Sequence, residues 1–113
     1  MQVIEPKFKI IFLEEALRFL EIINQHASDK IIYNIDKARI VNDPKLFKKL
    51  RDDIWEFRTD YSGLQYRLLA FWDKAENVNT LVVATHGLIK KTDKIPDKEI
   101  GKAIAIRKKY FNA

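Results

Sequence analysis

Three runs dense in β-branched and aromatic residues dominate the second half of the chain: Ile54 to Thr59, Gln65 to Trp72 and Thr80 to Ile89. Runs of this length and composition are typical of strands. Ser62-Gly63 separates the first two and tolerates the positive φ of a hairpin turn, and the polar segment Lys74 to Asn79 has an ordinary hairpin length. The pattern predicts a three-stranded antiparallel meander.

The residues before the meander predict a short strand followed by a helical hairpin. Alternating apolar residues between Lys7 and Phe12 have the period of an edge strand. From Glu14 the apolar side chains recur at the spacing of one helix face, and this helix should end between Gln25 and Ala27. Ser28 offers an N-cap hydroxyl to a second helix, from Asp29 to about Val41.

The remaining segments complete an α+β domain. Lys45 to Leu50 is a short apolar and basic bridge, whose main role we expect to be packing. Pro96 suits the first turn of a final helix, where its missing N–H costs nothing. Helices before and after one sheet make an α+β fold. With no linker or repeat, we expect residues 1–113 to form one domain.

The composition excludes several kinds of site. The absence of cysteine excludes disulfides and thiolate chemistry, and two widely separated histidines fit no familiar zinc spacing, so we expect no metal or cofactor. Three glycines are too few for a glycine-rich phosphate loop. The first residues resemble neither a signal-peptide core nor a membrane span, so we expect a cytoplasmic protein with no membrane partner.

Positive charge is concentrated in the later part of the chain. Residues 44–113 hold fifteen Lys and Arg against nine Asp and Glu, whereas residues 1–43 hold six against seven. A formal charge of +5 suggests an anionic partner, and the same charge also serves solubility. The charge alone therefore leaves nucleic-acid binding and simple solubility equally open.

Two arginines lie on neighbouring predicted strands, each close to Gly63. A loop of two or four residues would place Arg58 directly opposite Arg67, whereas a three-residue loop would place Tyr66 there. Facing guanidinium groups repel and need an anion, and on rigid strands they can grip a phosphate through paired hydrogen bonds. Either arginine taken alone is expected to pair with a carboxylate such as Glu56.

The third run ends in a basic tip. His86 can act as a general acid or base at neutral pH, although a lone strand histidine more often packs in a core. Gly87 permits a bulge or a close backbone approach. Lys90 and Lys91 fit either a solvated strand end or a contact with an RNA backbone.

The segments Ile54-Trp55-Glu56-Phe57-Arg58, Gln65-Tyr66-Arg67-Leu68-Leu69 and His86 to Thr92, with Pro96 and Glu99-Ile100 after them, carry a family likeness. They resemble the HigB branch of the RelE/ParE toxin superfamily. The resemblance implies a RelE-like fold and a toxin of a type II toxin-antitoxin system. Such a toxin enters the ribosomal A site, cuts mRNA there and is neutralised by a cognate antitoxin, often of the helix-turn-helix type.

The implied chemistry needs no metal, because RNA carries its own nucleophile in the 2′-OH. Under the resemblance the arginines stabilise the phosphate, His86 moves a proton and the lysines grip RNA or supply an acid. The candidate catalytic residues are Arg58, Arg67, His86 and Lys91, and the candidate RNA-binding residues are Lys48, Lys49, Lys90 and Lys94.

One departure keeps two other functions open. Glu56 stands where a catalytic lysine is expected. A ParE-like toxin that inhibits DNA gyrase by binding needs no catalytic residue, and a catalytically weak toxin homologue can act as an antitoxin-binding co-repressor.

Overall fold

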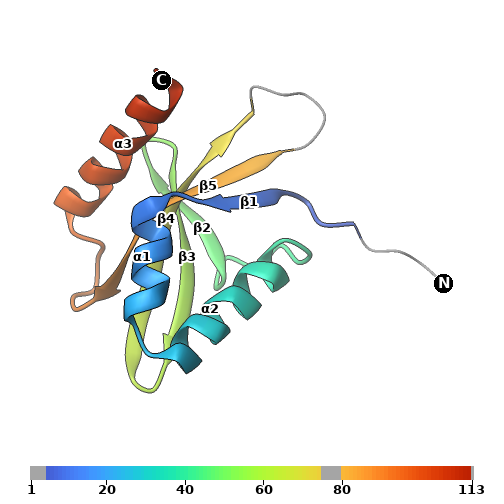
Figure 1. Ribbon diagram of the computed structural model, residues 1–113, viewed down its shortest axis with the longest axis vertical. Helices are drawn as coiled ribbons and strands as arrows, with labels where there is room; N and C mark the ends of the chain where they lie inside the picture. The colour runs from blue at the N-terminus through green and yellow to red at the C-terminus, as the bar shows by residue number, and fades with distance from the viewer. Residues whose placement is uncertain (1–4, 75–79, 113) are drawn as a thin grey trace.

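The computed structural model describes residues 5–74 and 80–112, which form a five-stranded mixed sheet with helices on both faces (Figure 1). The order across the sheet is β1-β5-β4-β3-β2, and only the β1–β5 pair is parallel. This confirms the α+β fold class. The elements are β1 (Lys9–Phe12), α1 (Glu14–Ile22), α2 (Gln25–Ala38), β2 (Phe47–Arg51), β3 (Ile54–Tyr61), β4 (Leu64–Asp73), β5 (Leu81–Lys90) and α3 (Asp97–Phe111).

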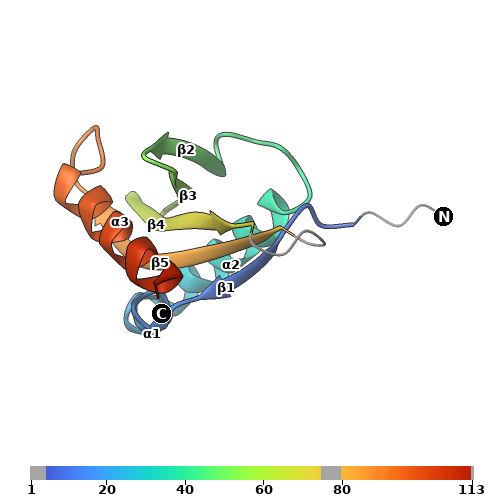
Figure 2. The ribbon, with the colours of Figure 1, turned by 90° about the horizontal axis from the view of Figure 1, so that it is seen from above.

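Two apolar clusters hold the helices on opposite faces of the sheet (Figure 2). Ala16 of α1 and Ile31 of α2 belong to the cluster that includes Phe57 and Leu68 of the sheet. Ile100 and Ala103 of α3 pack with residues of the other face, Ile54, Leu69, Phe71 and Val83. None of the helices that the structure describes is both long and apolar enough to cross a bilayer.

The antiparallel part of the sheet has four strands, so the predicted three-stranded meander is wrong by one strand. The segment predicted as a packing bridge, Lys45 to Leu50, contains most of β2, which pairs with β3. A two-residue turn joins them, with φ of 51° at Asp52 and 63° at Asp53. Aspartate tolerates this left-handed conformation, although Asp-Asp is a weaker hairpin signal than Asn-Gly. The predicted connection Lys74 to Asn79 lies, from residue 75 on, outside the described residues.

The helical hairpin has its turn earlier than predicted. The side chain of Asn24 caps α2 by accepting hydrogen bonds from the N–H groups of His26 and Ala27. Ser28, the predicted cap, lies inside α2, and its hydroxyl donates to the carbonyl of Leu20 in α1. Asn and Ser are both good N-caps, so the sequence left two starting points for this helix. Pro96 occupies the N-cap position of α3 without a side-chain hydrogen bond, and so it precedes the helix and is not its first residue.

The hairpin between β3 and β4 sets the register on which the candidate site depends. Its loop has two residues, Ser62 and Gly63, with φ of 50° and 81°, and Tyr61 pairs with Leu64. Both residues therefore adopt the positive φ required by a twist-matched hairpin turn. The two-residue loop places Arg58 directly opposite Arg67.

Candidate functional site: a cationic face at the hairpin end of the sheet

Strand alternation gathers charged residues on the α3 side of the sheet, towards the β3–β4 hairpin. In successive rows across the sheet, Glu56 lies opposite Lys48, and Arg58 lies opposite Arg67. In the next row Gln65 lies between Asp60 of β3 and Lys90 of β5. We call the resulting surface the arginine face; it consists of Lys48, Glu56, Arg58, Asp60, Arg67 and Lys90.

Glu56 is the centre of the arginine face. Its side chain is 4% exposed, and its carboxylate lies 3.4 Å from Arg67 Nε, 3.9 Å from Arg58 Nε and 3.9 Å from Lys48 Nζ. Glu56 Oε1 and both arginine Nε atoms are buried, and none of them finds a hydrogen-bond partner among the described residues. Three cations thus share one buried carboxylate, at distances that leave hydrogen-bonding capacity unused.

Arg67 is the most enclosed of these cations, with a side chain only 2% exposed. Its Nη1 donates to Asp60 Oδ1 at 3.1 Å and to the carbonyl oxygen of Tyr66 at 2.9 Å, and its Nη2 donates to Gln65 Oε1 at 3.4 Å. The Asp60 side chain is 72% exposed. An anion arriving from solvent must therefore compete with Asp60 for Arg67, whereas Arg58, with 29% of its side chain exposed, is directly accessible.

A cavity of about 300 Å³ opens between α2 and the part of β3 that β2 does not cover. Arg58, Arg67 and Asp60 line it together with Lys30 and Lys45. Lys30 Nζ donates to the Asp60 carbonyl at 2.9 Å. Sequence reasoning missed both lysines, because their proximity depends on how α2 packs across the sheet and not on any local pattern.

The remaining predicted RNA-binding lysines, and Lys91, which was predicted to be catalytic, are divided between two regions. Lys90 and Lys91 line a cavity of about 270 Å³ at the hairpin tip, and Lys94 lies exposed in the loop that follows β5. Lys49 pairs with Trp55 across β2 and β3, and its ammonium lies 3.6 Å from Asp53. Alternation therefore turns Lys49 away from the arginine face.

His86 lies apart from the arginine face. Leu69 stands between it and Glu56 in the same row of the sheet, and its side chain is 4% exposed. Its Nε2 lies 3.2 Å from Glu99 Oε1 of α3, and its Nδ1 lies 2.9 Å from Thr85 Oγ1. Burial, aided by the charge of Lys102, lowers the pKa of His86 below its usual 6.5 despite the contact with Glu99. Both ring nitrogens are engaged, and the residue joins β5 to α3.

The chain was compared with models of protein families. Residues 18–108 match the model described as phage-derived protein Gp49-like (DUF891). The matched range runs from the middle of α1 to near the end of α3 and includes every residue of the arginine face. A search of curated proteins found no match.

Proposed function

Because the chain belongs to the phage-derived Gp49-like family, which is associated with the toxins of toxin-antitoxin systems, we propose that it inhibits translation as a ribosome-dependent mRNA endonuclease. The family implies an antitoxin partner, and we propose one of the helix-turn-helix type. The ribosomal A site and its mRNA are the proposed target, in keeping with a RelE/HigB-like toxin.

One observation carries this proposal: Arg58 and Arg67 face each other across β3 and β4. Two guanidinium groups on adjacent rigid strands form a site suited to a phosphate, and the neighbouring Lys48 and Lys90 extend the positive surface along an RNA backbone. A surface that only bound a protein would gain little from such convergence.

The proposed reaction is in-line attack by the 2′-OH of RNA on the adjacent phosphorus. The O2′–P bond forms, the P–O5′ bond breaks, and the products are a 2′,3′-cyclic phosphate and a 5′-OH end. Arg58 stabilises the charge that develops on the phosphoryl oxygens, and Arg67 adds to it once Asp60 gives way. In this proposal Asp60, exposed beside both arginines, takes the hydroxyl proton, and Lys91 protonates the leaving oxygen.

The burial of His86 supports a positioning role for this residue in place of direct proton transfer. Its ring is held between Thr85 and Glu99, and so it fixes α3 on the sheet beside the arginine face. Lys90 and Lys94 hold the RNA backbone at the hairpin end, with Lys48 on the far strand. Lys49 lies outside this proposed contact.

The proposal is tested by inducing the protein in a bacterium and mapping mRNA 5′ ends. We expect growth arrest with new 5′ ends, and about a hundredfold less cleavage for Arg58→Ala, the size of effect typical of removing one charge-stabilising donor. Arg18→Ala is the matched control, because Arg18 is exposed on α1 and pairs only with Glu14 among the described residues. Growth arrest without new mRNA ends would contradict the proposal.

A second function is favoured by the burial of Arg67 against Glu56, since an arginine so compensated contributes less to catalysis. A toxin that acts by binding, such as a gyrase inhibitor of the ParE type, would tolerate this arrangement. Loss of plasmid supercoiling on induction, with intact mRNA, would identify it. An induced protein that binds its antitoxin without arresting growth would instead be a co-repressor.

A further inference from the structure

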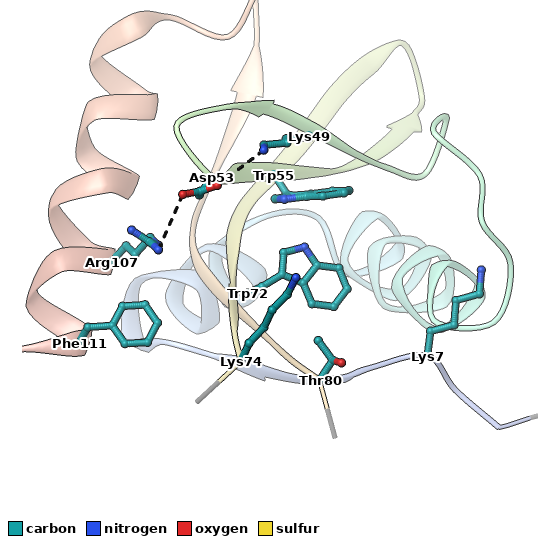
Figure 3. Close-up of a pocket in the computed structure, with 9 residues that line it drawn as sticks. All are labelled: Lys7, Lys49, Asp53, Trp55, Trp72, Lys74, Thr80, Arg107 and Phe111. Atoms are coloured by element: carbon teal, nitrogen blue, oxygen red, sulfur yellow. Dashed lines mark ion pairs between the residues drawn. The ribbon is translucent and has the colours of Figure 1, made fainter. Parts of the chain in front are cut away.

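A second cationic site lies at the other end of the sheet, where β4 ends and β3 begins. It is a cavity of about 630 Å³, and we call it the tryptophan pocket (Figure 3). Trp55 and Trp72 form its centre, Arg107 and Phe111 of α3 close one end, and Lys7 lies at the other. Its volume falls in the range of small-molecule sites. The arginine face contributes no residue to it.

The two indoles present aromatic surface to this cavity. Their ring centroids are 5.7 Å apart, and the rings meet edge to face at 81°. Phe47 stacks on Trp55 from behind, with centroids 4.9 Å apart, and Phe8 meets the ring of Trp72 at 5.2 Å. Both indoles are only half-buried, and they also line a smaller adjoining cavity. The aromatic packing fixes the rings while leaving part of their surface open to a ligand.

The charge around the indoles is positive. Four cations line the tryptophan pocket against one carboxylate, Asp53, which Lys49 approaches at 3.6 Å and Arg107 at 4.0 Å. Lys7 and Lys74 form no ion pair within the described parts of the chain, and Lys74 Nζ lies 5.7 Å from the Trp72 ring centre. The buried Nε of Arg107 has no hydrogen-bond partner there either. An anionic ligand would neutralise cations that no described carboxylate pairs with.

Aromatic rings fixed inside a positive groove are the means by which proteins bind single-stranded nucleic acids without reading their sequence. The bases stack on the rings, and the cations hold the phosphates. We propose that the tryptophan pocket binds a nucleotide unit of single-stranded RNA, with its base against Trp72 and its phosphates between Lys7 and Lys74. The pocket is a binding site separate from the arginine face and involves no chemical step.

This site is independent of the proposed cleavage. Trp72 follows Arg67 on β4, so about 17 Å separates the two sites along the strand. Five positions also place the two side chains on opposite faces of β4, Arg67 on the α3 side and Trp72 on the side of α1 and α2. An RNA strand that reaches both would have to pass around the sheet. Binding at the tryptophan pocket stands even if the arginine face cleaves nothing.

The chain has only two tryptophans, and both line the pocket, so intrinsic fluorescence reports on it directly. The probe is a short 2′-O-methyl oligouridylate, which lacks the free 2′-OH and is not cleaved. We expect the full chain to bind it with quenched fluorescence and with affinity that falls as salt rises. No quenching at low salt would overturn the proposal.

Three variants separate the contacts. Trp72→Leu should weaken binding about tenfold or more, and Trp72→Phe, which keeps an aromatic face, should weaken it less. Lys7→Ala with Lys74→Ala should weaken binding about tenfold and flatten its salt dependence, while leaving the fold intact because both side chains are exposed. Arg18→Ala with Lys37→Ala removes two exposed cations of α1 and α2 that do not line the pocket; it is the control for nonspecific charge and should retain the quenching.

Two outcomes would contradict this assignment. If the Lys7/Lys74 variant binds and quenches as the unchanged chain does, or loses no more binding than the Arg18/Lys37 control, the RNA binds elsewhere. If an acidic peptide containing aromatic residues quenches the fluorescence and the oligouridylate does not, the pocket binds a protein segment. Because the probe is not cleaved, neither result depends on whether the arginine face is an endonuclease.

Discussion

At the scale of single residues, Glu56 holds three cations together with a carboxylate that is almost fully buried. Removing one partner of a buried ion pair leaves the other charge uncompensated. We expect Glu56→Gln to lower the free energy of unfolding by about 3 kcal/mol, measured by urea denaturation. Asp60→Asn, which changes an exposed partner of the same Arg67, should cost less than about 1 kcal/mol. Equal losses for the two variants would contradict this account of the arginine face.

His86 gives the chain a pH-dependent stability. Because burial lowers its folded-state pKa, the unfolded chain binds a proton near its usual pKa of 6.5 while the folded protein remains unprotonated there. Stability should therefore fall as the pH drops below about 6.5, until the folded-state pKa is reached. NMR titration of the imidazole should show a pKa below 6.5, and His86→Gln should remove this part of the pH dependence. An imidazole that titrates above 6.5 would contradict the prediction.

Several residue-level features were predictable from sequence and others were not. Strand alternation and a short Ser62-Gly63 loop were enough to propose the Arg58–Arg67 pair. The sequence predicted an ion pair with Glu56 only for a single arginine. Glu56 binds cations from three strands, and this arrangement depends on the register of β2, which the sequence did not show. The sequence left His86 open between proton transfer and core packing, because its partner Glu99 comes from α3, whose docking no local pattern shows.

At the scale of elements, Gly87 permits the contact between α1 and β5. A Cβ built at this glycine would lie 2.2 Å from Phe19 Cδ2, so the helix packs directly on the strand backbone. We expect Gly87→Ala to destabilise the protein by about 1–3 kcal/mol, because the Phe19 ring has to shift. Gly101, exposed on α3, has nothing within 4 Å of its virtual Cβ, and Gly101→Ala should stabilise by about 0.5–1 kcal/mol. Thermal unfolding of both variants tests the two predictions. No loss of stability for Gly87→Ala would refute the contact between Phe19 and the β5 backbone.

Element boundaries were hardest to predict where two local signals compete. Asn24 and Ser28 both suit an N-cap, and packing of α1 on α2 decides for Asn24 by engaging the Ser28 hydroxyl with Leu20. The strand β2 was missed because Lys48-Lys49 interrupts its alternation. Its place at the sheet edge rests on Phe47, which packs on the ring of Phe57 with centroids 4.2 Å apart. Such a contact is visible only once the strands are paired.

At the scale of the whole molecule, the positive charge divides between the two ends of the sheet. The sequence showed an excess of positive charge in residues 44–113, but it did not show that this charge forms two separate surfaces. Lys7, Lys30 and Arg107 contribute to these surfaces from distant segments of the chain. A charged surface that binds RNA phosphates must do so with strong salt dependence.

That dependence gives a prediction for the hairpin tip. With single-stranded RNA, each phosphate contact adds about 0.7 to the slope of log affinity against log salt. Replacing both Lys90 and Lys91 with alanine should lower this slope by about 1.4 if each lysine contacts one phosphate. Arg18→Ala should leave it unchanged, since Arg18 lies on α1. An unchanged slope for the double variant would exclude the tip from the RNA contact.

Cleavage of mRNA by 2′-OH attack at the arginine face can be measured in a reconstituted translation reaction. A defined mRNA is supplied with ribosomes and the purified protein, and the ends of its fragments are analysed. We expect fragments ending in a 2′,3′-cyclic phosphate and no cut when the nucleotide at that position is 2′-deoxy. Equal cutting of the deoxy-substituted mRNA, or intact mRNA from a protein that arrests growth, would contradict it.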